Sequence, residues 1–95
     1  MGFGVFYIIK CWNSEEYFYK VGITSYSVKR RYNSKRDMPY NYEIIQEITD
    51  IPNNVWNLEL LLKQYIKNNN FHYIPNIQFG GYLNECFKYF NERSL

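Results

Sequence analysis

Tyr17-Phe18-Tyr19-Lys20-Val21-Gly22-Ile23-Thr24 is typical of a β-strand, because aromatic and β-branched residues fill most of its positions. A similar run precedes it, Val5-Phe6-Tyr7-Ile8-Ile9-Lys10, and the polar residues between the two runs predict the turn of a β-hairpin. A basic segment follows the second run. The hairpin therefore presents Tyr7 and Lys20 beside a cluster of positive charge, which suits a site that holds phosphate.

The remaining elements are predicted from hydrophobic periodicity. Strands are expected over residues 4–12, 17–24 and 42–49, and helices over residues 28–37, 55–68 and 82–92. The order β-β-α-β-α-α predicts an α/β fold, a small sandwich with a central three-stranded antiparallel sheet flanked by helices. With 95 residues, the chain is expected to form a single domain over residues 1–95.

Charge is informative through its distribution more than through its sum. The formal net charge is only +2, which does not by itself indicate a nucleic-acid-binding protein. Five of the eleven basic residues, however, fall within eight consecutive positions: Lys29, Arg30, Arg31, Lys35 and Arg36. Such a run is often a solvated helix face. Because this basic run follows the turn at Gly22, it also predicts an electrostatic contact surface for the phosphates of nucleic acid.

The two cysteines and the N-terminus indicate where the protein resides. Cys11 and Cys86 form no CxxC pattern, so neither a zinc site nor a thioredoxin-like motif is indicated, and both are expected to be buried thiols in a reducing compartment. The apolar run near the N-terminus is too short for a signal peptide or a membrane span. We therefore expect a soluble intracellular protein, in the cytoplasm or nucleus of a host cell, with no membrane partner.

At this point the sequence resembles the GIY-YIG nucleases, a family that cuts DNA. The first motif of the family is matched by residues 6–10 and the second by residues 20–22, and residues 19–24 look most like a phage and large-virus subgroup. Gly4 lies one residue further from Tyr7 than the first motif's glycine usually stands. Lys20 occupies the place of the second motif's tyrosine. The resemblance extends from Gly4 to about Phe87.

This resemblance implies a metal-dependent endonuclease that hydrolyses DNA phosphodiester bonds through an activated water, with Mg²⁺ or Mn²⁺ as cofactor. Tyr7 would act as the general base, and Lys20 would lower the cost of its deprotonation, because an unperturbed tyrosine has a pKa of about 10. Arg30, eight residues after Gly22, matches the arginine that holds the scissile phosphate.

Arg31 is the competing candidate for that arginine. Neighbouring residues on a helix point roughly 100° apart, so only one of the two can face Tyr7 and Lys20. Arg31 shares the face of Val28, three residues earlier, and we therefore favour Arg30. Arg31 is then expected, with Lys29, Lys35 and Arg36, to contact nucleic acid.

Glu59 matches the family's metal-binding glutamate, and a hard cation that keeps several waters needs only one or two carboxylates. The alternative is a surface ion pair with Lys63, which stands at i+4 on the same expected helix. Near the C-terminus, Asn84 or Glu85 could reach the site. We favour instead a first-turn role for both in the expected helix over residues 82–92.

Two other function classes remain open. One is a non-catalytic nucleic-acid- or protein-binding module on the same fold, which the substitution of Lys20 for tyrosine favours. The other is an aromatic platform for single strands, with Phe18 or Tyr26 as the bases' stacking partners. Wherever the protein binds nucleic acid, we expect that nucleic acid to be DNA. A domain of this size is expected to have little sequence specificity by itself, which leaves three alternatives open: a homodimer, a specificity-conferring partner protein, or recognition of a DNA structure such as a branch.

Overall fold

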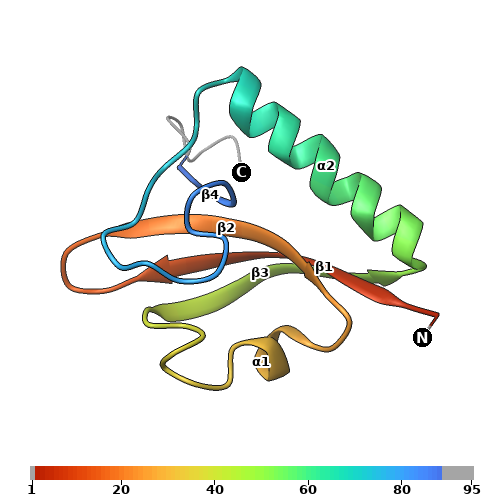
Figure 1. Cartoon of the computed structure of the whole chain (residues 1–95), viewed down its shortest axis with the longest axis horizontal. Coiled ribbons are helices and arrows are strands. Elements are labelled where there is room, and N and C mark those ends of the chain that lie inside the picture. The colour runs from red at the N-terminus through yellow and green to blue at the C-terminus, as the bar shows by residue number, and fades with distance from the viewer. Residues whose placement is uncertain (1, 89–95) are drawn as a thin grey trace.

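The computed structural model describes residues 2–88 and shows a mixed α/β fold built on one antiparallel sheet (Figure 1). The strands are β1 (Gly4–Trp12), β2 (Tyr17–Thr24), β3 (Asn41–Asp50) and β4 (Cys86–Phe87), in the order β3-β1-β2-β4 across the sheet. The helices among these residues are α1 (Val28–Arg31) and α2 (Pro52–Asn68), which lie on opposite faces of the sheet (Figure 1). Neither is long and apolar enough to cross a membrane.

The β1–β2 hairpin is confirmed. Its turn closes on the side chain of Asn13, whose Oδ1 accepts the backbone N–H of Glu15 at 2.9 Å and of Glu16 at 3.0 Å. Asparagine favours such turns because its short side chain substitutes for a backbone acceptor. The register then places Tyr7 opposite Gly22 and Ile9 opposite Lys20.

Alternation along the two central strands gives the sheet a separate core on each face. The core on the α2 face contains Phe6, Tyr19, Val21, Val55, Ile66 and Phe87. The core on the α1 face contains Tyr7, Ile9, Cys11, Phe18, Val28, Tyr32, Met38, Tyr40, Phe79 and Cys86. Burial raises the pKa of each of the two free thiols, Cys11 and Cys86, to about 12, so both are protonated, as expected of buried cysteines.

Strand β3 crosses from one core to the other through an irregularity in its pairing with β1. The register shifts between Ile8 and Ile9, which pair with Gln46 and Ile44. Ile44 consequently packs against the α1-face core and Ile48 against the α2-face core, while Ile45 between the shifted pairs is exposed. An extra residue in one strand has this effect on side-chain direction.

The helix expected over residues 28–37 is much shorter in the structure. Its backbone hydrogen bonds end with Tyr32 N–H to Val28 O, at 3.0 Å. Further along, the Ser34 hydroxyl accepts the backbone N–H of Asp37 and donates to the Asp37 carboxylate, each at 3.2 Å. Serine competes with the helical hydrogen-bond pattern in this way, which accounts for a turn where the basic residues had suggested helix. The second helix begins at Pro52, three residues earlier than expected, because proline suits a first helical turn.

The helix expected over residues 82–92 does not form in residues 82–88, so that prediction was wrong there. A fourth strand, β4, forms instead, and the sheet has four strands where three were expected. Gly81 adopts a φ of +81°, and the chain turns there and enters β4. The Val21 N–H donates to Glu85 O at 3.0 Å, so the outer edge of β2 captures this segment. The remainder of the expected helix, residues 89–92, lies outside the described residues.

The irregular segment between α2 and β4 covers the α1 face, and Glu16 of the hairpin turn holds it there. The carboxylate of Glu16 accepts hydrogen bonds from the hydroxyls of Tyr40, at 2.6 Å, and Tyr73, and from the backbone N–H of Asn76. Burial alone would raise the pKa of Glu16, but these hydrogen bonds, together with the charge of Lys88, outweigh it and lower that pKa.

Candidate functional site

The hairpin places Tyr7 and Lys20 side by side on the α1 face, where they are only 2% and 1% exposed. The ring of Tyr7 lies against Gly22 on the neighbouring strand. A Cβ atom at residue 22 would stand 2.6 Å from Cζ of Tyr7, closer than such contacts occur. Glycine at this position therefore permits the tyrosine ring to lie flat across the strand pair.

Tyr7 is hydrogen-bonded to Tyr32, the residue that ends α1. Their hydroxyl oxygens are 2.5 Å apart and their rings are nearly perpendicular. Burial raises the pKa of Tyr7 well above its usual value, even though the charge of Lys20 acts in the opposite direction. Burial likewise raises the pKa of Tyr32 to about 12. Both phenols are therefore neutral near pH 7, so the expected activation of Tyr7 by a neighbouring cation is outweighed by its burial.

Lys20 carries a buried positive charge that the surrounding groups compensate. Its Nζ donates to Oε1 of Glu85 at 2.6 Å. The same ammonium lies 5.6–5.9 Å from the ring centroids of Tyr7, Tyr32 and Phe79, within the range of cation–π attraction. A buried charge is tolerated only with such partners, so Glu85 and the three rings fix where the ammonium lies.

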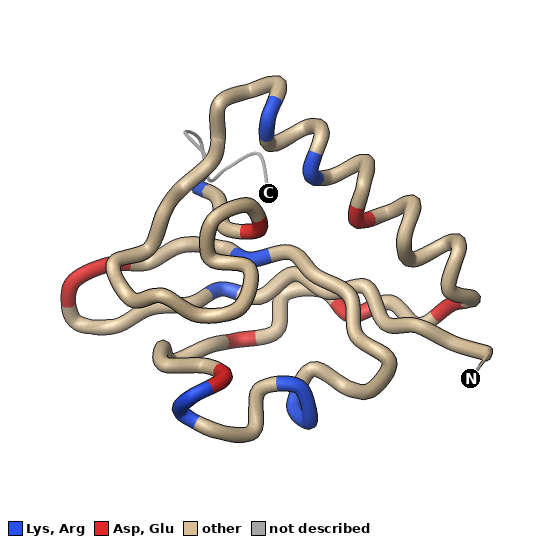
Figure 2. The backbone as a smooth tube through the Cα atoms, in the orientation of Figure 1, with Lys and Arg blue, Asp and Glu red and all other residues tan. Residues whose placement is uncertain are grey.

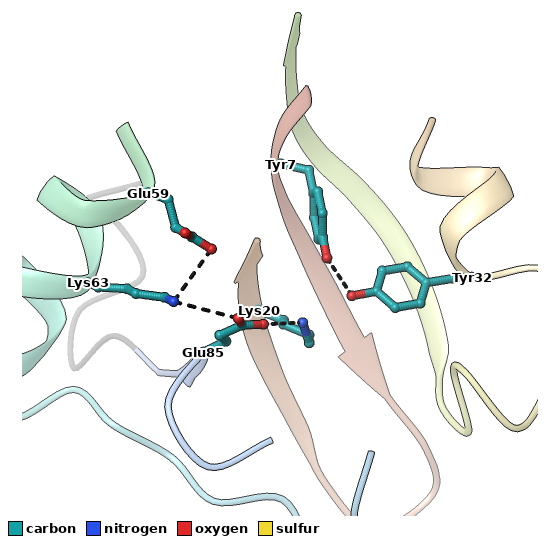
Figure 3. A network of polar contacts seen from close by, with 6 residues as sticks. All are labelled: Tyr7, Lys20, Tyr32, Glu59, Lys63 and Glu85. Atoms are coloured by element: carbon teal, nitrogen blue, oxygen red, sulfur yellow. Dashed lines mark hydrogen bonds and ion pairs between the residues drawn. The ribbon is translucent and has the colours of Figure 1, made fainter. Parts of the chain in front are cut away.

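The charged groups continue from Glu85 to helix α2, as Figure 3 shows. Nζ of Lys63 lies 3.5 Å from Oε2 of Glu59 and 3.5 Å from Oε2 of Glu85. The i, i+4 pair expected from the spacing of Glu59 and Lys63 is thus present. Glu59 is only 8% exposed, while Lys63 and Glu85 are partly exposed, so the network runs from a buried carboxylate toward the surface.

The two carboxylates of this network are of the donor type that a divalent cation takes, and both are paired with lysines in the structure. The ammonium of Lys63 lies between two carboxylates, which shows that Glu59 and Glu85 are placed to share a positive charge. Carboxylate oxygens are the donors that Mg²⁺ and Mn²⁺ prefer, and such ions commonly keep several waters. No cluster of three or more metal-binding side chains occurs within residues 2–88, so waters or substrate would have to complete the coordination.

The two candidate arginines point to different places. The Arg31 guanidinium lies 4.9 Å from the ring centroid of Tyr32, and its Nη2 is 3.2 Å from where a Cβ of Gly80 would stand. The Arg30 guanidinium lies 4.3 Å from the ring centroid of Tyr26, which is 55% exposed. Arg31 is therefore the arginine beside the Tyr7–Tyr32 pair, whereas the family resemblance and helical geometry both favoured Arg30 as the residue that holds the phosphate.

Hydrogen bonds from two backbone N–H groups at its N-terminus hold α1 in this position. The Ser27 hydroxyl accepts the backbone N–H of Arg30 at 3.1 Å, and a carboxylate oxygen of Glu47, on β3, accepts the backbone N–H of Val28 at 3.1 Å. Acceptors at this end satisfy N–H groups that have no partner within the helix. The three other basic residues of the segment, Lys29, Lys35 and Arg36, are exposed, and Figure 2 shows this positive charge gathered on the α1 side of the sheet.

Sequence reasoning did not single out Tyr32 as a site residue. Glu85 was named as a residue that could reach the site, but a role in the first turn of a helix was favoured, and that helix does not form there. The sequence does carry a signal for each: Tyr32 directly follows Arg31, and Glu85 follows the Gly80-Gly81 pair that allows the chain to turn. Phe18, suggested as a stacking platform, is fully buried and cannot contact a nucleobase.

Comparison of the chain with family models, with curated proteins and with solved structures finds no match.

Proposed function

We propose that this protein is a metal-dependent endonuclease of the GIY-YIG type, which hydrolyses DNA phosphodiester bonds through an activated water. One observation carries the proposal: two hydrogen-bonded tyrosines, an arginine and two carboxylates from distant parts of the chain belong to one series of contacts, which Lys20 connects. Phosphodiester hydrolysis needs groups to position water, to hold the phosphate and to bind a cation, and this cluster contains a candidate for each.

Arg31 is assigned to the phosphate. Its planar guanidinium can contact two phosphoryl oxygens at once, and stacking on Tyr32 limits its orientations before substrate arrives. Arg30, Lys29, Lys35 and Arg36 are assigned to the DNA backbone on either side, where exposed charge contributes affinity that weakens with salt.

Tyr7 is assigned to the attacking water. As a neutral phenol it can orient that water by hydrogen bonding, with Tyr32 fixing the direction of the Tyr7 hydroxyl. The charge of Lys20 lowers the pKa of Tyr7 against the effect of burial, so Lys20 reduces the cost of removing a proton there. Glu59 and Glu85 would hold Mg²⁺ or Mn²⁺, which supplies Lewis-acid stabilisation of the phosphoryl and leaving oxygens when bound.

The direct test is nicking of supercoiled plasmid by purified protein in Mg²⁺ or Mn²⁺, beside the same reactions in EDTA. We expect metal-dependent nicking by the wild type and a loss of about a hundredfold or more in Glu59→Gln and in Glu85→Gln. Glu15→Gln is the matched control, because Glu15 is exposed in the hairpin turn and its side chain makes no contact in the described residues. Nicking that survives EDTA, or that Glu59→Gln leaves unchanged, would contradict the assignment of the metal.

A second function is favoured by one specific observation, the burial of Tyr7 and Lys20. Both side chains are almost fully buried, the ring of Phe79 lies 5.9 Å from the Lys20 ammonium, and the carboxylate of Glu85 already neutralises Lys20. A non-catalytic nucleic-acid-binding module would bind through the exposed basic residues, and the buried cluster would only stabilise the fold. Wild-type protein that binds DNA but cuts neither plasmid nor branched DNA with either metal would establish that alternative.

A further inference from the structure

An open pocket of about 470 Å³ lies beside the candidate site, between the irregular segment after α1 and the adjoining ends of β1 and β3. Three aromatic rings, two amides and an ammonium form the part of its lining that matters here: Trp12, Tyr32, Tyr42, Asn33, Asn41 and Lys35. The candidate active site makes no use of this pocket except through Tyr32.

Trp12 provides a large and accessible aromatic surface at the end of β1. Its side chain is 36% exposed, and it also borders a second hollow of about 310 Å³, shared with Lys10, Tyr17 and Glu43. Most aromatic residues of the α1-face core are by contrast almost fully buried. An exposed indole between two hollows is suited to stacking against a flat ring.

Three polar side chains of the pocket are available to a ligand. The side-chain amides of Asn33 and Asn41 are exposed and make no hydrogen bond within residues 2–88, and Lys35 forms no ion pair there. An amide offers one acceptor and two donors, the combination that the edge of a nucleobase can match. The lysine adds a positive charge at the same pocket, as a neighbouring phosphate would require.

Tyr32 connects the pocket to the candidate active site. It lines the pocket, its hydroxyl is hydrogen-bonded to that of Tyr7, and the Arg31 guanidinium lies over its ring. A single side chain thus separates the pocket from the group assigned to the scissile phosphate. Successive nucleotides of one strand can therefore occupy the two places.

We propose that this pocket binds an unpaired nucleobase next to the phosphate that is cut, with Trp12 as the stacking partner and Asn33 and Asn41 as hydrogen-bonding partners. A base inside an intact duplex is stacked on both sides and cannot enter. The substrate class is therefore DNA with an unpaired nucleotide near the cut, as in a flap, bulge or single strand. This inference rests on the proposed nuclease function, whose phosphate site the pocket adjoins.

The experiment measures binding in EDTA, so that it does not depend on cleavage. Trp56→Phe removes the only other tryptophan and leaves Trp12 as the fluorescent reporter. We expect a short single-stranded oligonucleotide to quench Trp12 and to bind about tenfold or more tightly than a blunt duplex of equal length. An abasic oligonucleotide carries the same phosphates without bases. Equal binding and quenching by the abasic strand would overturn the proposal.

Variants separate the pocket from general electrostatic attraction. Trp12→Leu is expected to lower single-strand affinity about tenfold, whereas Trp56→Leu on the exposed side of α2 leaves it unchanged. Asn33→Ala tests the same pocket at an exposed position whose side chain makes no hydrogen bond within residues 2–88. Unchanged single-strand affinity in both Trp12→Leu and Asn33→Ala would contradict the pocket assignment.

Plasmid nicking distinguishes failure of the pocket from failure of the nuclease. If the wild type does not nick DNA but Trp12 still reports selective binding of unpaired bases, the nuclease proposal fails and the pocket stands. If nicking is metal-dependent and Trp12 does not respond to bases, the pocket proposal fails alone.

Discussion

The two faces of the β1–β2 hairpin are built from the same strands but differ in chemistry. On the α2 face the strands contribute Phe6, Tyr19 and Val21 to an apolar core, and the buried carboxylate on that side, Glu59, comes from the helix and not from the strands. On the α1 face they contribute Tyr7 and Lys20, which are buried among hydrogen bonds and ion pairs. The first arrangement is what stability alone requires. The second places costly polar groups in the interior, which is characteristic of functional sites.

The largest effect on stability is expected from the α1 face, at Lys20. Lys20→Met removes the ammonium and leaves the Glu85 carboxylate with only its longer contact to Lys63, so we expect a loss of about 3 kcal/mol in the free energy of unfolding. Urea denaturation measures it. The double variant Lys20→Met/Glu85→Leu should recover much of this loss. No recovery would show that the two side chains contribute independently.

The α2 face is expected to respond as an ordinary core. Ile66→Ala removes a buried side chain, 1% exposed, and should lower the free energy of unfolding by about 2–3 kcal/mol through lost burial and a cavity. DNA binding measured on the remaining folded protein should not change. An altered affinity would mean that the two faces are not independent, and the contrast between them would have to be abandoned.

A smaller effect is expected when the Tyr7–Tyr32 hydrogen bond is removed. Tyr32→Phe leaves the buried hydroxyl of Tyr7 without this partner and should cost about 1–2 kcal/mol. Because Tyr7→Phe breaks the same bond, the double variant should cost clearly less than the sum of the two single variants. Strict additivity in this double-mutant cycle would contradict a direct bond.

The smallest effect is expected from alkaline pH. The pKa values of Tyr7 and Tyr32 are raised in the folded protein, whereas tyrosines of the unfolded chain ionise near pH 10. Their contribution to stability is therefore complete below about pH 10 and declines as the pH rises above it. Unfolding by urea between pH 8 and 11 measures the decline. The Tyr7→Phe/Tyr32→Phe variant should show a shallower one, and an identical slope would assign the effect to other tyrosines.

The α2 face was predictable because its residues follow periodicity. Val55, Leu62 and Ile66 fall on one side of a long helix, and apolar residues with that spacing are buried wherever a sheet is available. Tyr7, Lys20 and Glu59 were also singled out from the sequence, and contacts through Glu85 and Lys63 connect them in the structure, while their catalytic roles stay predictions. The resemblance to a nuclease family contributed as much to that selection as the residue pattern did.

The arginine and the last segment were harder to predict, for two physical reasons. Arg31 and Arg30 were compared on a helix of ten residues, but α1 spans four, so the assumed geometry did not apply. Cys86 and Phe87 fit a helical repeat, yet the open edge of β2 offers backbone hydrogen bonds that a helix cannot use. As a strand they fill both cores, Cys86 on one face and Phe87 on the other, which local periodicity cannot reveal.

The measurement that tests the central claim most directly is plasmid nicking in Mg²⁺ by Arg31→Ala beside Arg30→Ala, with the wild type and an EDTA reaction. The two arginines are neighbours of equal charge, so general attraction to DNA affects both variants alike. A functional centre around Tyr7 and Tyr32 predicts that Arg31→Ala reduces nicking about a hundredfold or more and that Arg30→Ala reduces it only a few-fold. The reverse order, or a wild type that binds DNA and never cuts it, would contradict the assignment of catalysis to this cluster.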